Sequence, residues 1–119
     1  MAQEEIGKKV ELAFLMAFYG GMLTEKQREV LSMHCEDDMS LGEIAQDAGV
    51  SRQGVHDMLT RGAHRLFEME EKLGFAARFS RMEEGLERCR ACLKSGRYDE
   101  AEQVLDALIR FDQEENNGL

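Results

Sequence analysis

Apolar side chains recur every three or four residues along most of this chain, which is the spacing of one face of an α-helix. The first such segment runs from about Glu4 to Tyr19, becomes apolar on almost every side in "LAFLMAFY", and ends before Gly20 and Gly21. A helix that is apolar all round has more than one neighbour. We therefore expect this helix either to be held in the core or to form a dimer contact as well.

Two capping patterns mark the starts of the next helices. In "TEKQ" (24–27) and "SLGE" (40–43), a hydroxyl and a longer polar side chain can each satisfy a free backbone N–H group. They predict one helix over about 25–36, which the acidic "EDD" ends, and a short one to about residue 48. Next, Gly49 suits the positive φ of a sharp turn, Val50 can fill the angle between helices, and Ser51 can cap the following helix.

This layout predicts a helix-turn-helix. The residues that such a unit buries are all apolar here: Leu41, Ile44, Ala45, Val50, Val55 and Leu59. The same scaffold also serves protein contacts, so the pattern indicates the fold more strongly than it indicates DNA binding.

The helical pattern continues past the turn to Leu73, and Gly74 ends it. Spacings of four and three relate the apolar positions Val55, Leu59, Gly62, Leu66, Met69 and Leu73, and again Phe75, Phe79, Met82, Leu86, Cys89 and Leu93. Two such stripes joined at a glycine predict an antiparallel helical hairpin within the chain or a seam between subunits, with the core within the chain as the first expectation.

The last segment contains a turn at Ser95 and Gly96 and then an amphipathic helix. Its expected inward residues are Tyr98, Ala101, Val104, Leu105, Leu108 and Phe111, and the tail from Asp112 is expected to fray. We expect two parts: residues 1–74, an N-terminal helix plus a helix-turn-helix with a long recognition helix, and residues 75–119, a C-terminal helical extension.

The composition agrees with an all-α fold. The 119 residues include no proline and few aromatic residues, and they are 43% hydrophobic and 33% charged. The N-terminus is charged, and the longest nearly apolar run, 12–23, is too short to span a bilayer. Three cysteines form no disulfide framework. We expect a cytoplasmic chain with reduced thiols and no membrane insertion.

The net charge of −9 argues against a protein that coats nucleic acid by bulk charge, because such binding depends on Lys and Arg displacing counterions from phosphates. Residues 51–65 are the exception, with three Arg against one Asp. Binding to duplex DNA would therefore be local and weak, and a homodimer would double its phosphate contacts.

If the second helix of the motif enters a major groove, its first turns face the bases. The candidates there are Ser51, Arg52, Gln53, His56 and Asp57. Arg52 suits guanine, Gln53 suits adenine, and His56 suits a base or a phosphate. Phosphate candidates are Arg61, Arg65, Lys26 and Arg28. The alternative is that all are ordinary solvated residues. We favour recognition for Arg52 and Gln53 and the solvated alternative for the four phosphate candidates.

Other chemistry lacks a pattern in the sequence. Cys89 and Cys92 form a C-x-x-C without a second ligand pair, whereas a structural zinc site takes four ligands. His34, His56 and His64 stand apart, with no nucleophile beside them in the sequence. We therefore expect no enzyme, no metal and no cofactor.

Residues 23–66, "LTEKQREVLSMHCEDDMSLGEIAQDAGVSRQGVHDMLTRGAHRL", resemble the fourth conserved region of bacterial sigma factors. Together with "LAFLMAFYGGM" before them and "EMEEKLGF" after them, they are similar to the YlxM family of small helix-turn-helix proteins. Genes of that family typically lie beside that of the signal-recognition-particle GTPase. Gly54 and Gly62 depart from the helix formers expected in this helix, which indicates either a softer helix or close packing at Gly62.

The resemblance implies a non-enzymatic regulator that binds DNA and is linked to the signal-recognition-particle pathway. The alternative is a protein-interaction adaptor whose acidic surface meets a basic partner. By resemblance, the first partners to test are the signal-recognition-particle GTPase and its RNA complex.

Overall fold

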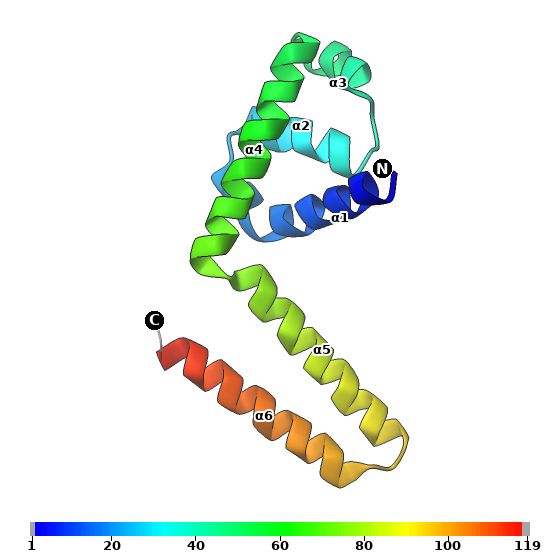
Figure 1. Ribbon diagram of the computed structural model, residues 1–119, viewed down its shortest axis with the longest axis vertical. Helices are drawn as coiled ribbons and strands as arrows, with labels where there is room; N and C mark the ends of the chain where they lie inside the picture. The colour runs from blue at the N-terminus through cyan, green and yellow to red at the C-terminus, as the bar shows by residue number, and fades with distance from the viewer. Residues whose placement is uncertain (1, 118–119) are drawn as a thin grey trace. The chain divides into compact units, whose positions relative to one another are not determined.

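The structure is a computed structural model that describes the backbone of residues 2–117 and the side chains of residues 8–114. All regular elements in these residues are helical, which confirms the all-α prediction (Figure 1). In chain order they are α1 (Ala2–Tyr19), the 3₁₀ turn η1 (Gly20–Met22), α2 (Glu25–Cys35), α3 (Leu41–Ala48), α4 (Arg52–Leu73), α5 (Phe75–Lys94) and α6 (Tyr98–Asn117).

Both predicted capping boxes are present. The Thr24 hydroxyl accepts the Gln27 N–H at 3.2 Å, and the Gln27 side chain accepts the Thr24 N–H at 3.3 Å. Ser40 and Glu43 exchange the same pair of bonds at 3.1 Å each. Because these bonds satisfy free donors at the helix starts, they set where α2 and α3 begin.

The chain divides into two compact units, with the division between Ala76 and Ala77. In the first unit, α1, α2 and α4 enclose one apolar cluster that includes Leu12, Leu15, Tyr19, Leu31 and Leu66. A second cluster joins α2, α3 and α4, with Val30, Met33, Ile44, Ala45 and Val55. The first cluster holds α1 in the core, as one of the two alternatives for this helix predicts.

Gly62 explains how closely α4 approaches α2. A Cβ at this position would lie 2.7 Å from Leu31 Cδ1, and Leu31 is completely buried. Such a distance is far inside ordinary van der Waals contact. The close-packing explanation for this glycine is therefore the correct one at Gly62.

A partly buried polar network at one end of the first unit joins α1 to the end of α4. The Tyr19 hydroxyl, on a side chain 2% exposed, donates to Glu70 Oε1 at 2.5 Å. The same oxygens accept backbone N–H groups, from Phe75 to Tyr19 Oη at 3.1 Å and from Ala76 to Glu70 Oε1 at 3.0 Å. Burial raises the pKa of the Tyr19 phenol, and the Glu70 hydrogen bond acts in the same direction. Together these bonds fix the start of α5.

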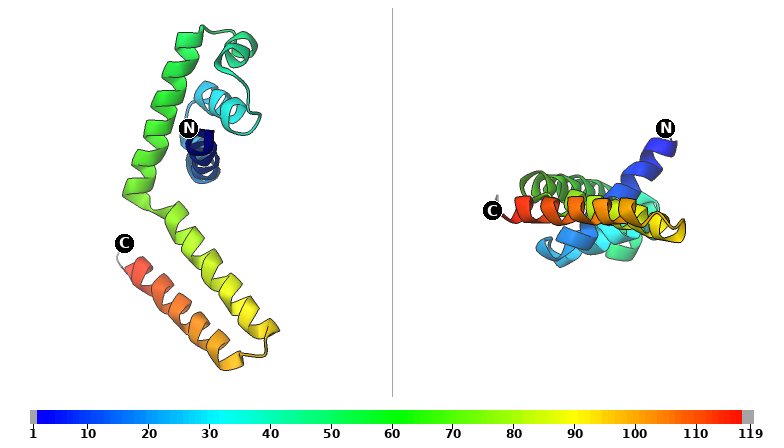
Figure 2. Two further views of the ribbon diagram at one scale, coloured as in Figure 1. Left: turned by 45° about the vertical axis from the view of Figure 1, so that its right-hand side comes forward. Right: turned by 90° about the horizontal axis from the view of Figure 1, so that it is seen from below.

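In the second unit, α5 and α6 lie side by side and antiparallel in Figure 1 and in the left view of Figure 2. The helices approach through small residues, since Gly85, Cys89 and Cys92 are buried on α5 and a Cβ at Gly85 would overlap the Leu108 side chain. Cys89 Sγ lies 3.7 Å from the Ala101 carbonyl oxygen. On the α5 side this core is made of small side chains, and Leu108 of α6 packs against them.

The predicted inward stripe of the hairpin is wrong at several large residues. Exposed apolar side chains on α5 are Phe75, Phe79, Leu86 and Leu93, and those on α6 are Tyr98 and Leu105. Leu73 at the end of α4 is exposed as well. A helix in a two-helix hairpin buries only the strip that faces its neighbour. On α5 that strip contains Gly85, Cys89 and Cys92. Gly85 and Cys92 directly precede Leu86 and Leu93 in the sequence, so the two leucines project from an adjacent side of the helix.

The predicted fraying from Asp112 is also wrong as far as the structure describes the tail. Helix α6 continues to Asn117, and Asp112 forms an ion pair with Arg78 of α5. Gly118 and Leu119 lie outside the described residues.

Candidate nucleic-acid interface

The helix-turn-helix of α3 and α4 has the local geometry that the sequence predicts. Gly49 adopts φ 71°, in the left-handed region, and ends α3. Ser51 then caps α4, its hydroxyl accepting the Gly54 N–H at 2.9 Å. Ile44 of α3 and Val55 of α4 are both fully buried. The two helices are therefore anchored on the core and leave the first turn of α4 at the surface (Figure 1).

The base-reading candidates lie together on this first part of α4, and all five are exposed. Gln53 Nε2 donates to Asp57 Oδ1 at 3.1 Å. The same carboxylate oxygen lies 3.9 Å from His56 Nδ1. Asp57 thus holds the amide of Gln53, and a bidentate contact of Gln53 with adenine would require that amide to leave the carboxylate. Ser51 is occupied as the helix cap, and Arg52 extends from the exposed first turn.

Lys26 has a structural partner that the sequence did not reveal. Its Nζ donates to the Ala48 carbonyl oxygen at 2.8 Å, so it satisfies a free acceptor at the end of α3. This contact ties α2 to the turn of the motif and competes with a phosphate contact. Arg28 is exposed on α2, and its Cδ lies beside Gly20, 3.8 Å from where a Cβ would stand.

Arg61 and Arg65 are exposed but are not gathered with Arg52. Nine residues separate Arg52 from Arg61, which is about two and a half turns of an α-helix and places them on opposite sides of α4. A groove entered by the first turn of α4 would therefore meet these arginines from different sides. This arrangement suits contacts to the two flanking phosphate backbones better than contacts to adjacent phosphates.

A groove of about 760 Å³ beside α4 was not predicted from the sequence. Its lining includes apolar Leu12, Leu31, Leu59 and Phe67 together with Lys8, Lys9, His34, His56 and His64. The ion pair of Lys9 with Asp38, 2.6 Å long, joins α1 to the segment before α3. His56, Thr60 and His64 recur every four residues and so lie on one side of α4, where they line the groove. This spacing is the sequence feature from which that side of the groove could have been predicted.

Within the described residues, no three His, Cys, Asp or Glu side chains are grouped closely enough to hold a metal ion. No helix in this part of the chain combines the length and apolar character needed to cross a membrane. The exposed side chains at the start of α4 carry guanidinium, amide and imidazole groups, which can form hydrogen bonds.

Comparison with known proteins agrees with this geometry. Residues 6–109 match the UPF0122 family of helix-turn-helix proteins, which are YlxM / p13 like. The chain belongs to the UPF0122 family. The UPF0122 protein of Halalkalibacterium halodurans is 38% identical over 104 residues, covering 87% of this chain and 95% of that protein. A UPF0122 protein of Bacillus cereus is 35% identical over 107 residues, covering 88% and 97%.

A UPF0122 protein of Acetivibrio thermocellus is 49% identical over a shorter stretch of 72 residues, which covers 60% of this chain and 62% of that protein. The match to the family model, residues 6–109, extends well beyond the helix-turn-helix. It includes most of α1 and most of the α5–α6 hairpin.

Proposed function

We propose that this UPF0122 protein is a non-enzymatic regulator in the cytoplasm that binds duplex DNA through the first turns of α4. The observation that carries the proposal is the exposed start of α4, which presents Arg52 and Gln53 while Ser51 caps the helix and Val55 anchors it in the core. In this proposal Ser51, Arg52, Gln53, His56 and Asp57 face the bases. Arg61, Arg65 and Arg28 contact phosphates, and Lys26 does so when its ammonium leaves the Ala48 carbonyl.

The two parts of the chain have separate roles in this proposal. Residues 1–74 bind DNA, and residues 75–119 bring two copies together. Dimerisation matters because a single α4 helix makes few phosphate contacts. The affinity for DNA and its dependence on salt both increase with the number of phosphate contacts. A homodimer would present two such helices to two half-sites.

The experiment is fluorescence-anisotropy binding to a random duplex pool, followed by selection of preferred sequences. Binding of the wild type should weaken steeply as salt rises, because counterions are released from the neutralised phosphates. Arg52→Ala/Gln53→Ala should lose sequence preference, and Arg52→Ala/Arg61→Ala should also reduce the salt slope by about one, because Arg61 contacts a phosphate. Arg88→Ala, an exposed arginine of the second unit, is the matched control and should leave both unchanged. Absence of binding at low salt refutes the proposal.

A second function is favoured by the net charge of −9. It is an adaptor for a basic protein partner, and the signal-recognition-particle GTPase or its RNA complex is the first to test because of the resemblance to YlxM proteins. Co-sedimentation with that complex, in the absence of DNA binding, would select this function. An adaptor role for the acidic surface also predicts that neutralising acidic residues weakens the complex, whereas Arg52→Ala/Gln53→Ala does not.

A further inference from the structure

The α5–α6 hairpin has an inverted distribution of side-chain size. The buried cluster between its helices contains Cys89, Cys92 and Ala101, with Val104 packed against it. Leu108 is a large side chain that the hairpin does bury, whereas Phe79, Leu86, Leu93, Leu105 and Ile109 are each 41–55% exposed. A two-helix hairpin with so small a core gains little from its own burial and usually depends on a further partner.

These large side chains lie on one face. Phe79, Leu86 and Leu93 are seven residues apart, so they project from the same side of α5. Leu86 and Met82 of α5 line a shallow groove of about 330 Å³ together with Leu105 and Ile109 of α6. We call Phe79, Met82, Leu86, Leu93, Leu105 and Ile109 the apolar hairpin face.

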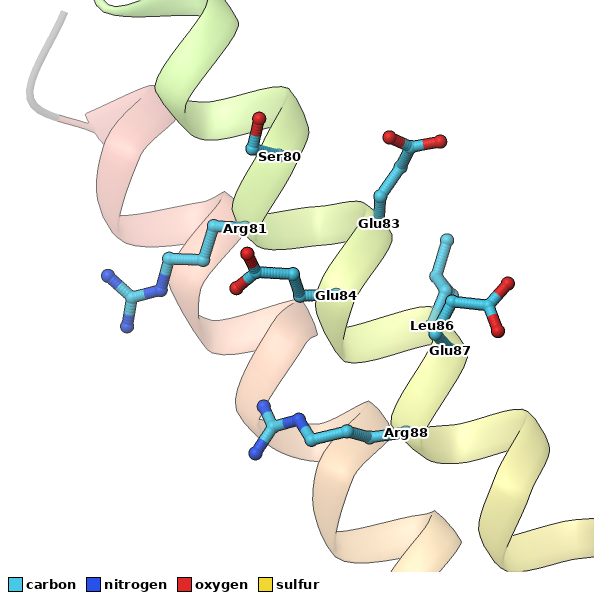
Figure 3. Close-up of a pocket in the computed structure, with 7 residues that line it drawn as sticks. All are labelled: Ser80, Arg81, Glu83, Glu84, Leu86, Glu87 and Arg88. Atoms are coloured by element: carbon cyan, nitrogen blue, oxygen red, sulfur yellow. The ribbon is translucent and has the colours of Figure 1, made fainter. Parts of the chain in front are cut away.

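The other side of the hairpin is already satisfied by polar contacts. The Arg81 guanidinium lies 4.1 Å from the centroid of the Phe111 ring, which is a favourable cation–π distance. Arg88 lines a hollow there with Arg97 and Glu100. Figure 3 shows Glu83, Leu86 and Glu87 projecting from α5 on the side away from Arg81 and Arg88. The hairpin is therefore amphipathic, and its apolar face is exposed to solvent in the single chain.

We propose that a second copy of this chain covers the apolar hairpin face, so that two hairpins form an antiparallel four-helix bundle. This inference deepens the proposed function, since it rests on the homodimer posited there and supplies its surface. Bundles of this kind bury heptad-spaced apolar residues between facing helices. An exposed apolar face rimmed by charged residues is typical of a protein–protein contact.

Charge complementarity selects a second copy as the occupant. Glu83 and Arg90 are exposed and lie three and four residues on either side of Leu86. When two α5 helices run antiparallel with Leu86 opposite Leu86, Phe79 meets Leu93 of the other copy. Glu83 then faces Arg90 of the other copy, twice over by symmetry. Within one chain Arg90 pairs with Glu87 at 2.9 Å, an exposed contact that leaves it able to serve both carboxylates.

Sedimentation equilibrium of the full chain over the micromolar range tests the proposal, without DNA present. The wild type is expected to sediment at twice the chain mass. Leu86→Asp should raise the dissociation constant at least about a hundredfold, because it places two charges in the centre of the contact. Leu86 is half exposed in the single chain, so the helical circular dichroism of the variant should be retained. A wild-type chain that remains monomeric overturns the proposal.

Charge exchange provides a second test that does not depend on the core. Glu83→Arg should weaken the dimer about tenfold, through two repulsive pairs. Glu83→Arg/Arg90→Glu should restore most of that loss. Glu84→Arg, the same change at an exposed neighbour, is the control and should have little effect. If Glu83→Arg and Glu84→Arg act equally, the antiparallel register is wrong.

The two proposals fail separately. A dimer that does not bind the duplex pool refutes the DNA function and leaves the hairpin contact standing. A monomer that binds DNA refutes the hairpin contact and the pairing role of residues 75–119, and leaves the DNA-binding function standing.

Discussion

Replacing Gly62 with alanine probes the close approach of α4 to α2. The new Cβ would lie 2.7 Å from Leu31 Cδ1, and Leu31 is completely enclosed, so its side chain has no solvent to move into. Overpacking of this kind costs about 1–3 kcal/mol. Alanine is about 1 kcal/mol better than glycine inside a helix. We expect Gly62→Ala to lower the free energy of unfolding by about 1 kcal/mol in net.

The sign of this effect should reverse when Leu31 is shortened. Leu31→Ala alone should cost about 2–5 kcal/mol, because it leaves a cavity in the first apolar cluster. In that variant the atom that a Cβ at position 62 would overlap is gone, whereas the helix preference for alanine remains. Adding Gly62→Ala should therefore stabilise the Leu31→Ala variant by about 1 kcal/mol. The double-mutant cycle thus separates packing from propensity.

Tyrosine fluorescence during urea unfolding reports on the first unit selectively. The chain has two tyrosines and no tryptophan. Tyr19 is buried in the cluster under test and Tyr98 is exposed in the second unit, so a Tyr98→Phe background leaves Tyr19 as the reporter. Gly42→Ala is the control, since its Cβ would meet Ser40 Oγ only at 4.0 Å. If Gly62→Ala stabilises the background protein by about 1 kcal/mol, the packing argument is refuted.

Three further outcomes follow from side-chain contacts. Tyr19→Phe should lower the free energy of unfolding by about 1.5–3 kcal/mol, because it removes the hydrogen bond to the Glu70 carboxylate, and circular dichroism in urea measures it. Lys9 lowers the pKa of the Asp38 carboxyl. The stability from this pair is therefore present above the unfolded pKa of Asp38 and is lost as the pH falls through its lower folded pKa. The difference in unfolding free energy between wild type and Asp38→Asn should vanish in acid, and a difference that persists there contradicts the assignment. Burial raises the pKa of the Cys35 thiol, so iodoacetamide should alkylate it more slowly than free cysteine at mildly alkaline pH, as peptide mass spectrometry can follow. Equal rates would show that the thiol is accessible and unshifted.

Local signals in the sequence were sufficient for the helices of the first unit. The caps at Thr24, Ser40 and Ser51 act within three residues, and Gly49 needs only its own backbone freedom. Such interactions depend on neighbours in the chain, so periodicity and capping chemistry could locate α2, α3 and the start of α4. They also placed Arg52 and Gln53 on an exposed first turn.

Contacts between distant segments were invisible to the same reasoning. The sequence contains no sign that Lys26 reaches the Ala48 carbonyl or that Lys9 pairs with Asp38. The groove beside α4 likewise draws on residues of four helices. Each depends on how far a flexible side chain extends in a packed structure.

The α5–α6 hairpin shows the division between the two levels most clearly. Sequence alone determined that both segments are amphipathic helices joined by a turn at Gly96, because spacing and turn chemistry are properties of the chain. Only the tertiary structure decided which strip of α5 faces α6. Gly85 and Cys89 permit closer helix packing than the larger residues beside them, so Leu86 and Leu93 remain outside. Apolar periodicity predicts that a face will be buried, but close packing between particular helices decides what buries it.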